Sequence, residues 1–361
     1  MSHDRKIRVL LIAPSHNILG GQAVQATRLM AALRKEPSLE IDFQPIDQLL
    51  PGLLAKLQRI RYVKLVLYWT AYVTCLVARV WRYDIVHVFS AAYTSYALWT
   101  LPALFIAKLY GKPIILNYRD GQAEDHLRNW RIAIPTIRMM DAVVGNTSFL
   151  VDVFAKFGLR IQAISNILDM EPFRYRARSR LKPVFLHNRI LEPLYNIPCS
   201  LRAFKRVQER YPEAAMTVAH DGPSKGELEA YAAEIGLKNC RFIGRVPHAR
   251  VADLYDSADI YFTSPDFDCM PGSLLECFAS GLPVVATHSG GIPYIAENER
   301  TALLVPPGDD EAMARAAFRL LDDPMLVERL TRAAYESCAR FAEGPVREQW
   351  TALYRKLVSR A

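Results

Sequence analysis

Two carboxylates, Asp268 and Glu276, stand eight positions apart in the stretch SPDFDCMPGSLLECFASGLPVVATHSGGIPYI, which covers residues 264–295. A helical pattern begins near Gly272, so Glu276 falls in the first turns of a helix and Asp268 in the loop before it. The Glu276 carboxylate can accept hydrogen bonds from two vicinal hydroxyl groups, such as those of a ribose. The N–H groups of Gly272 and Ser273 at the helix start suit a phosphate. The stretch therefore predicts a site for a ligand with hydroxyl and phosphate groups.

Two other positions have residue types suited to anion binding. Gly20 and Gly21 precede the first long helical pattern, and glycine lets a backbone approach a ligand closely. A plain loop is the alternative, and without G-x-G-x-x-G a Rossmann dinucleotide site is not expected. Arg189 follows the strand pattern PVFLHN, where its guanidinium can bind a diphosphate through two hydrogen bonds. An exposed arginine without a ligand is the alternative reading of Arg189.

Alternating strands and helices must position these groups. In residues 1–170, strand patterns such as DIVHVFS and KPIILNY alternate with helical patterns, such as SYALWTLPALFIAKLYG between these two strands, and a second such series begins near Lys182. This alternation predicts an α/β protein with two doubly wound, Rossmann-like domains whose sheets are mostly parallel. Because ligands bind outside the carboxyl ends of parallel strands, we expect the candidate residues at those edges, facing a cleft between the domains.

The expected domain boundaries follow the change in composition between the two series. The segment ILDMEPFRYRARSRLKP is polar and basic, with two prolines, which is typical of a linker. The predicted organisation is an N-terminal domain at 1–170, a linker at 171–182, a C-terminal domain at 183–343, and a final helix at 344–361.

Composition and charge narrow the function classes. The chain has 361 residues, 51% hydrophobic and 23% charged, which is ordinary for a globular protein. Its six cysteines form no C-x-x-C pair, so we expect a reducing, cytoplasmic location, and no secretory signal is evident. Residues 1–170 hold 20 Lys or Arg against 12 Asp or Glu, which accounts for the entire net charge of +8. No basic stripe with interleaved aromatics lies outside 53–84, so nucleic acid is not an expected partner.

The segment 53–84 departs from the α/β pattern. It is helical and apolar on most sides, and its uncharged core, residues 65–78, is shorter than the about 20 residues of a membrane span. Basic residues flank that core, and aromatic residues are spaced along it. The segment 53–82 therefore predicts helices lying on an anionic membrane surface, peripheral to its inner face. A helix pair packed on the sheet is the alternative.

Several spaced motifs resemble glycosyltransferase family 4, the "glycosyl transferases group 1" type with a GT-B fold. They include a carboxylate, seven residues and a glutamate, then ASGLPVVAT and GGIP. The other matching motifs, in chain order, are GGQAVQATRLMAAL, DIVHVFS, SNILDMEPF, GRVPHARVADLYDSADIYFTSP and TALLVPPGDDEAMARAAFRLLDDP. The likeness covers nearly the whole chain, and the M-P pair of the donor loop points to one subfamily.

The resemblance implies a retaining glycosyltransferase that moves a sugar from a nucleotide-sugar, a UDP- or GDP-sugar, to a glycan or lipid-linked acceptor. The resemblance also implies that 1–170 is the acceptor-side domain, that 183–343 is the nucleotide-sugar-binding domain, and that the final helix, 344–361, returns to the N-terminal domain. No metal or other cofactor is implied. The diphosphate would lie on Arg189 and backbone N–H groups, and the ribose on Glu276. The implied catalytic residues are Asp268, Arg119 and His126, and the implied donor-binding residues are Gly20, Gly21, Asn188, Arg189, Gly222, Arg245, Val246, Met270, Pro271, Gly272, Ser273, Leu274 and Glu276.

Departures from the family pattern keep other functions open. Leu194 or Tyr195 replaces the usual diphosphate lysine, Arg119 stands where a histidine is expected, and His126 follows seven residues later. These changes favour a catalytically weak or inactive nucleotide-sugar-binding partner as the first alternative, with a nucleotide-sugar epimerase as the second. Asp266 and Asp268 form an Asp-x-Asp pattern, but its loop belongs to the donor element, so a manganese site is not expected.

Overall fold

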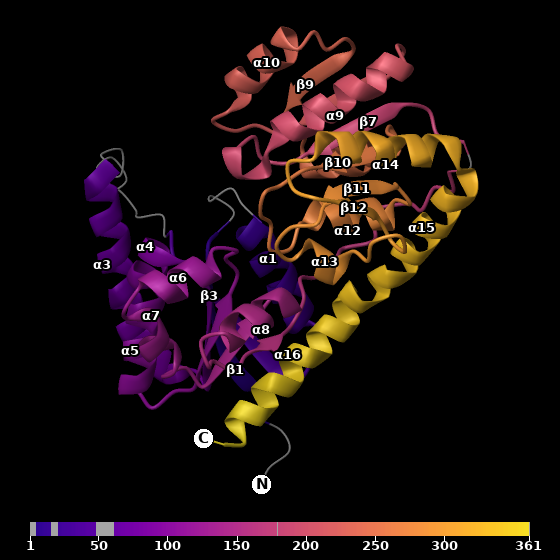
Figure 1. The fold of residues 1–361 in the computed structure, drawn as a ribbon. Coiled ribbons are helices and arrows are strands. Elements are labelled where there is room, and N and C mark those ends of the chain that lie inside the picture. Colours follow the sequence, from indigo (N-terminus) through magenta and orange to yellow (C-terminus); the bar gives the residue numbers. More distant parts are fainter. Residues whose placement is uncertain (1–4, 16–20, 48–60, 179, 361) are drawn as a thin grey trace. The chain divides into compact units, whose positions relative to one another are not determined.

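The computed structural model describes residues 5–15, 21–47, 61–178 and 180–360. The chain folds into two units. Unit 1 comprises Met1–Ile167 with Glu343–Ala361, and unit 2 comprises Leu168–Ala342. The two doubly wound α/β sheets predicted from the sequence are confirmed (Figure 1).

Unit 1 is built on a six-stranded sheet with strand order β2-β1-β3-β4-β5-β6. All its strand pairs are parallel, so the carboxyl ends of its strands share one edge. The central strands are buried on both faces, which explains their continuous apolar runs. The strands are β1 (Ile7–Ala13), β2 (Leu39–Pro45), β3 (Ile85–Ser90), β4 (Ile114–Tyr118), β5 (Ala142–Gly145) and β6 (Gln162–Ala163).

Helices cover both faces of this sheet. On one face α1 contacts α16, and the apolar side chains of both join those of β1 and β3 in one core. Elsewhere α3 packs against α5, and α5 contacts β3 and β4. The helical elements of unit 1 are α1 (Gly21–Arg34), α3 (Arg61–Arg79), η1 (Val80–Arg82), α4 (Tyr93–Ser95), the π-helical η2 (Tyr96–Thr100), α5 (Leu101–Leu109), α6 (Ala123–Asn129), α7 (Ala133–Ile137), α8 (Ser148–Ala155) and α16 (Glu343–Val358).

The last helix, α16, completes the core of unit 1. Trp350 of α16 is fully buried and stacks on His87 of β3, with ring centroids 4.4 Å apart. The hydroxyl of Tyr354, one turn later, lies 2.7 Å from His87 Nδ1. The opposite ring nitrogen of His87 lies 3.0 Å from Asn117 Nδ2, so both nitrogens are satisfied. Burial lowers the pKa of His87 well below its ordinary value, so this histidine is a neutral core residue.

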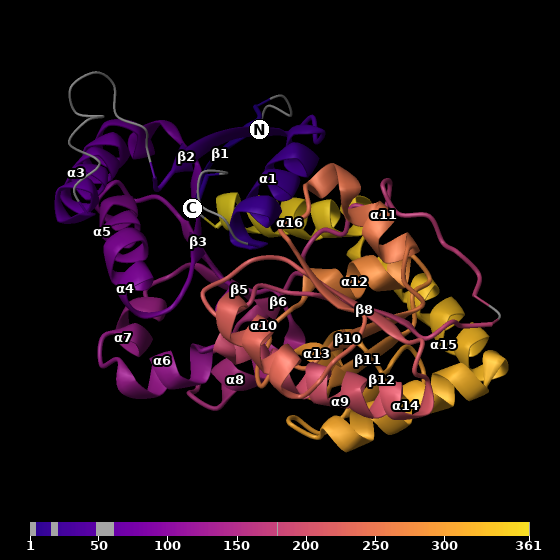
Figure 2. The same cartoon turned by 90° about the horizontal axis from the view of Figure 1, so that it is seen from above.

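Unit 2 is built on a second six-stranded parallel sheet, with strand order β12-β11-β10-β7-β8-β9. Its strands are β7 (Val184–Asn188), β8 (Ala215–Ala219), β9 (Cys240–Gly244), β10 (Ile260–Thr263), β11 (Val284–Thr287) and β12 (Leu303–Val305). Its helical elements are η3 (Pro193–Tyr195), α9 (Ile197–Arg210), α10 (Lys225–Glu234), η4 (His248–Arg250), α11 (Val251–Asp256), α12 (Gly272–Ala279), α13 (Ile292–Ile295), α14 (Asp310–Asp322), α15 (Pro324–Ser337) and η5 (Cys338–Phe341). Figure 2 shows α9, α14 and α15 on the outside of the strands.

The segment 171–182, expected to be a linker, belongs to unit 2. Arg178 is buried there, and its guanidinium donates hydrogen bonds to the carbonyls of Ser280 at 2.8 Å and Gly281 at 2.7 Å. Further bonds reach the carbonyls of Tyr255 and Ala258. Burial lowers the pKa of Arg178 to about 10. The basic character that suggested a solvated linker therefore includes an arginine that fastens the segment to its unit.

The described residues include no helix with the length and hydropathy needed to cross a bilayer. The apolar segment 53–82 is represented by α3 and η1, and residues 53–60 lie outside the described part of the chain.

Candidate functional site

The carboxyl edge of the unit 2 sheet gathers most of the predicted donor residues. Asn188 ends β7 and Arg189 follows it, while the loop from Ser264 to Pro271 leaves β10 and leads into α12. Because β7 and β10 are adjacent parallel strands, residues that follow them meet at one edge. The helix predicted near Gly272 begins at Gly272, and Glu276 lies in its second turn.

Arg189 and Asp268 form an ion pair at this edge. The guanidinium of Arg189 contacts the Asp268 carboxylate, and both side chains are largely buried. Burial raises the pKa of Asp268, whereas the Arg189 charge opposes that rise. Tyr195 lies under the guanidinium, 4.4 Å from ring centroid to Cζ. Arg189 is thereby held in one place by an ion pair and a cation–π contact.

A hydrogen-bond chain orients the Glu276 carboxylate. The Asn188 amide donates to the Tyr255 hydroxyl at 3.1 Å, and that hydroxyl donates to Glu276 Oε2 at 2.9 Å. Burial raises the pKa of Tyr255 well above its ordinary value, and the Glu276 charge adds to the shift. Tyr255 therefore stays protonated as the donor, and Glu276 keeps a partly exposed carboxylate with a second oxygen for a ligand.

The start of α12 combines buried and partly exposed residues. Pro271 is the N-cap, and Met270 and Leu274 are buried in the core, so these two side chains shape the loop rather than face a ligand. Gly272 has no heavy atom near the position of a Cβ. Ser273 Oγ lies 3.5 Å from a terminal nitrogen of Arg189, which brings the helix start to the arginine.

The loop Ser289–Gly291 packs against the donor loop at backbone distance. A Cβ on Gly290 would lie 2.4 Å from the Asp268 carbonyl oxygen, and one on Gly291 would lie 1.8 Å from that of Cys269. The Gly291 N–H donates to the Asp268 carbonyl at 2.7 Å. Glycine is required at both positions because any side chain would push the Asp268 loop away.

Gly222, Arg245 and Val246 lie along the same edge, on the side of β8 and β9. A Cβ on Gly222 would lie 2.4 Å from the carbonyl oxygen of Leu191, so the loop after β8 touches the loop after β7. Arg245 and Val246 directly follow β9, and the Arg245 side chain is exposed. The structure thus places these three residues at the predicted edge, next to β8 and β9, whereas Arg189 follows β7.

The remaining predicted residues lie in unit 1. Arg119 follows β4 and donates to Asn117 Oδ1 at 3.0 Å and to Asn166. Its guanidinium lies over the Phe89 ring at 4.4 Å from the centroid. Gly21, expected to precede the first long helix, is the first residue of α1, whereas Gly20 lies outside the described residues.

His126 is fully buried within an aromatic cluster. Its Nδ1 lies 2.9 Å from the Tyr118 hydroxyl, and its Nε2 has no hydrogen-bond partner among the described residues. The rings of Tyr93, Tyr96 and Trp130 surround it at centroid distances of 5.1–5.3 Å. Burial lowers the pKa of His126 to about 4. Because its partner is Tyr118 while Arg119 bonds to Asn117, the structure does not bring His126 and Arg119 together.

The Asp-x-Asp carboxylates have separate partners. Asp266 accepts a hydrogen bond from Asn196 at 2.7 Å, and Asp268 is paired with Arg189. Over the described ranges, no group of three or more His, Cys, Asp or Glu side chains could hold a metal ion.

Comparison with known proteins identifies unit 2. Residues 174–337 match the family Glycosyl transferases group 1. Residues 174–337 are therefore similar to a group 1 glycosyltransferase domain, and this match covers less than half of the chain. Every predicted donor residue of unit 2, from Asn188 to Glu276, lies within this domain, whereas Gly20, Gly21, Arg119 and His126 lie outside the match.

Two curated relatives are named as a phosphotransferase and a sulfoquinovosyl transferase. Exopolysaccharide phosphotransferase SCO2592 of Streptomyces coelicolor is 30% identical over 215 residues, 59% of this chain and 22% of that protein. Sulfoquinovosyl transferase SQD2 of Arabidopsis thaliana is 26% identical over 283 residues, 72% of this chain and 54% of that protein. The chain thus matches only about half, or less, of the length of these two relatives.

Solved structures show that the fold extends beyond the group 1 domain. Anabaena Alr3699/HepE, solved in complex with UDP and glucose, superposes with a TM-score of 0.75 at 16% identity, covering 96% of this chain and 99% of that one. The sucrose-phosphate synthase of Thermosynechococcus elongatus gives 0.77 at 18% identity, covering 99% of this chain and 100% of that one. These matches show the GT-B glycosyltransferase fold.

Two tyrosines of the group 1 domain were missed as site residues. Tyr255 stands in the motif GRVPHARVADLYDSADIYFTSP, whose tyrosine is part of the family pattern, so the sequence carried a signal for it. Tyr195 was noted only as a replacement for lysine, and its contact with Arg189 depends on the path of η3, which no local pattern reveals.

Proposed function

We propose that this protein is a retaining glycosyltransferase that moves a sugar from a nucleotide-sugar to a glycan or lipid-linked acceptor. The observation that carries the proposal is the arrangement of Arg189, Asp268 and the Asn188–Tyr255–Glu276 chain at one sheet edge of a group 1 domain. The proposed location is the cytoplasm, at the inner face of the membrane.

In the proposed donor complex, the diphosphate lies on Arg189 and on the N–H groups of Gly272 and Ser273. A helix start and a guanidinium are both suited to phosphate oxygens. The ribose hydroxyls bind the free oxygen of Glu276, and Asp268 binds hydroxyls of the transferred sugar. Because Asp268 is paired with Arg189 in the structure, donor binding must share the guanidinium between this carboxylate and the phosphates.

A UDP- or GDP-sugar is the proposed donor. Alr3699/HepE, which shares the fold, is described in complex with UDP and with UDP-glucose. In the proposed reaction the Arg189 charge stabilises the leaving diphosphate, which takes the proton of the acceptor hydroxyl on the same face of the sugar. The bond from the anomeric carbon to the diphosphate breaks as the bond to the acceptor oxygen forms, with retention of configuration. We propose that no metal takes part.

A weak or inactive nucleotide-sugar-binding partner is the second candidate. It is favoured by Tyr195, whose ring lies against the Arg189 guanidinium. Tyr195 stands at or next to the position where the family pattern has a lysine. It is also favoured by the burial of His126, which keeps this side chain from replacing the histidine expected at position 119.

A thermal-shift screen of nucleotides and nucleotide-sugars, followed by a transfer assay, tests both candidates. We expect one UDP- or GDP-sugar to raise the melting temperature, because a ligand bound only to the folded state stabilises it. The Glu276→Ala variant should lose most of that shift, whereas Glu227→Ala, an exposed glutamate on α10, should keep it. The absence of any shift with every nucleotide-sugar contradicts both candidates. A shift without transfer, with transfer restored by Arg119→His, supports the inactive partner.

A further inference from the structure

One face of α3 exposes large apolar side chains. The exposed fractions of Val66, Trp69 and Val77 are 61%, 38% and 45%. Their spacing of three and eight residues puts all three on one face of the helix. Tyr72 and Leu76, on the adjoining face, are fully buried. The helix is therefore anchored to unit 1 by one side and presents an apolar side to solvent.

The neighbouring α5 and η1 continue this apolar surface. Phe105 and Leu109, one turn apart on α5, are 53% and 77% exposed, and Trp81 of η1 is 54% exposed. The Tyr110 hydroxyl donates to the Val77 carbonyl at 2.9 Å, which joins the end of α5 to α3. Both η1 and α3 contact α5, and the two helices lie side by side in Figures 1 and 2.

The charges around this surface are mostly positive. Residues 61–118 contain six Lys or Arg but one acidic residue, Asp84, which accepts a hydrogen bond from Arg5 at 2.9 Å. The Arg82 guanidinium lies over the Trp81 ring, 5.1 Å from its centroid. An exposed basic group beside exposed tryptophan is typical of surfaces that meet the interfacial region of a bilayer.

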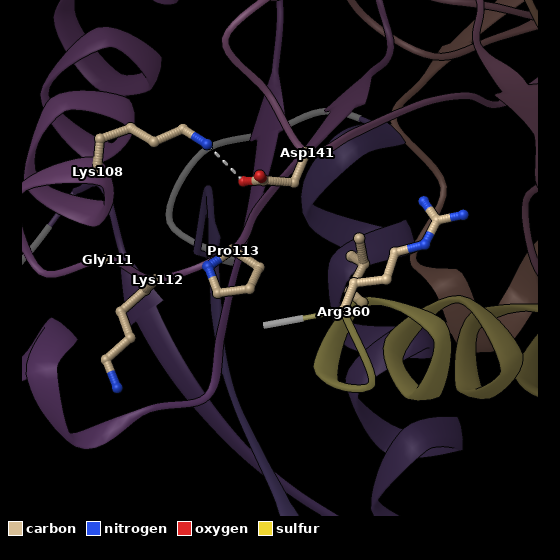
Figure 3. A pocket seen from close by; sticks show the side chains of 7 residues that line it. Lys108, Gly111, Lys112, Pro113, Asp141 and Arg360 are labelled. Carbon is tan, nitrogen blue, oxygen red and sulfur yellow. Dashed lines mark hydrogen bonds and ion pairs between the residues drawn. The ribbon is translucent and has the colours of Figure 1, made fainter.

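A basic pocket lies beside the end of α5 (Figure 3). It has a volume of about 340 Å³, and Lys108, Lys112 and Arg360 line it together with Asp141. Lys108 is paired with Asp141 at 2.8 Å. Within the described ranges, the side chains of Lys112 and Arg360 have neither an ion pair nor a hydrogen bond. These two cations are available to an anion from outside the protein.

We propose that this face docks unit 1 onto an anionic lipid bilayer surface. The apolar side chains enter the interfacial region, and the nearby cations bind lipid phosphates. The docking face is defined by Val66, Trp69, Val77, Trp81, Phe105 and Leu109, and its basic rim by Arg82, Lys112 and Arg360. This inference rests on the membrane location in the proposed function and identifies the residues and the lipid class. It extends the surface predicted at 53–82 to α5 and the C-terminal end of α16.

Charge favours a lipid surface over a second copy of the chain. Large contiguous apolar patches on monomers usually mark an interaction surface. Two copies meeting face to face would bring two basic rims together, and like charges at an interface are unfavourable. Phosphates of anionic lipids complement the rim, because Lys and Arg near an anionic lipid surface are attracted to it.

Vesicle flotation with the full chain tests the apolar part of the docking face. We expect the protein to float with vesicles of phosphatidylcholine and phosphatidylglycerol, and to float much less with phosphatidylcholine alone. The double variant Trp81→Glu, Leu109→Glu should lose binding by about tenfold or more, since it removes apolar contacts and adds like charge to the lipids. Met325→Glu is the matched control, because Met325 is a 73% exposed apolar residue of unit 2.

The rim is tested by charge reversal. Arg82→Glu with Lys112→Glu should lower binding to the anionic vesicles by about tenfold or more and weaken its dependence on salt, since two attractive charges become repulsive. Lys238→Glu, an exposed lysine of unit 2, should bind as the unaltered protein does. All variants should retain the melting temperature without ligand, which shows that they are folded.

Three results would overturn the docking proposal: no flotation with anionic vesicles, equal flotation of the Trp81→Glu, Leu109→Glu variant, or a dimer in sedimentation velocity that this variant converts to monomers. The nucleotide-sugar shift is measured on the same samples. Flotation without any such shift contradicts the proposed function alone, and a shift without flotation contradicts the docking proposal alone.

Discussion

At the scale of single residues, the Tyr255 hydroxyl connects two sides of the candidate donor site. It accepts from Asn188 and donates to Glu276, so it fixes the carboxylate that we assign to the ribose. A substitution that removes only this oxygen separates its positioning role from the packing of the ring.

Tyr255→Phe should weaken donor binding by roughly tenfold and lower the free energy of unfolding by about 1–2 kcal/mol, because Glu276 and Asn188 lose a buried partner. Donor titration by fluorescence or calorimetry, together with urea unfolding, measures both effects. Tyr211→Phe is the control, since the Tyr211 hydroxyl bonds to Asp322 at an exposed position. Equal donor affinity in Tyr255→Phe and the unaltered protein would contradict the assignment of this hydroxyl.

The buried His126 makes unit 1 sensitive to acid. Its pKa is lowered to about 4 in the folded protein, whereas an unfolded histidine has a pKa near 6.5. The unfolded state therefore binds more protons between these values. The stability that depends on neutral His126 is complete above about pH 6.5 and is lost as the pH falls toward 4.

His126→Phe should accordingly reduce the loss of stability between pH 7 and pH 5 by about 2 kcal/mol. Phenylalanine fits the aromatic surroundings and cannot be protonated. The measurement is the urea midpoint at both pH values, with His288→Phe, a change at an exposed histidine, as the control. A pH dependence identical to that of the unaltered protein would show that His126 is protonated without unfolding.

Residue types at the donor edge were largely predictable, because strand ends and the helix start at Gly272 can be recognised locally. Partners were not. That Asp268 would pair with Arg189, 79 positions away, depends on the adjacency of β7 and β10. His126 was predicted as a catalytic residue, but the helix α6 places it in a cluster of aromatic rings.

At the scale of elements, the contact between two loops decides the shape of the donor site. The Gly290–Gly291 turn follows β11 and presses on the backbone of the loop that follows β10. The position of Asp268 is thus set by the backbone of a neighbouring loop as well as by its ion pair with Arg189.

Gly291→Ala should destabilise the protein by about 1–3 kcal/mol, as overpacking does, and should abolish most donor binding. The added methyl group would lie 1.8 Å from the Cys269 carbonyl oxygen, so the donor loop must move. Gly226→Ala on α10 is the control, since no heavy atom lies within 4 Å of its Cβ position. Thermal melts with and without the donor compare the two variants.

Most strands could be placed from sequence because their apolar runs are buried on both faces. The helix expected between β3 and β4 proved to be α4, a π-helical turn and α5. The mostly apolar residues there carry no clear periodic signal that would reveal such a change in winding. The segment 171–182, expected to be a linker, belongs to unit 2 for a related reason. Composition cannot show that the Arg178 side chain donates hydrogen bonds to buried carbonyl groups.

At the scale of the whole molecule, α16 is the element that completes unit 1. It begins after unit 2 ends, and its Trp350 fills the core beside His87. The prediction that the last helix contributes to the N-terminal part of the fold came from the resemblance to GT-B proteins, since no local pattern indicates the partner of a terminal helix.

Trp350→Ala should lower the stability of unit 1 by about 3–5 kcal/mol, because it empties a fully buried indole site. Val358→Ala, at the exposed end of the same helix, should change it by less than about 0.5 kcal/mol. Hydrogen exchange resolved by peptide is the suitable measurement. We expect faster exchange in β1 and β3, with unit 2 protected as before; unchanged exchange in β3 would contradict this role of Trp350.

The position of α16 also affects the order in which the two units can finish folding during synthesis. Unit 2 is one continuous segment, Leu168–Ala342, whereas unit 1 needs residues from both sides of it. A chain emerging from the ribosome therefore has all of β1–β6 long before Trp350 exists. Unit 2 can fold as soon as it emerges, whereas the core of unit 1 still lacks Trp350 beside His87. The segment synthesised first is the last to acquire its complete core, so this period is when a chaperone would be needed most.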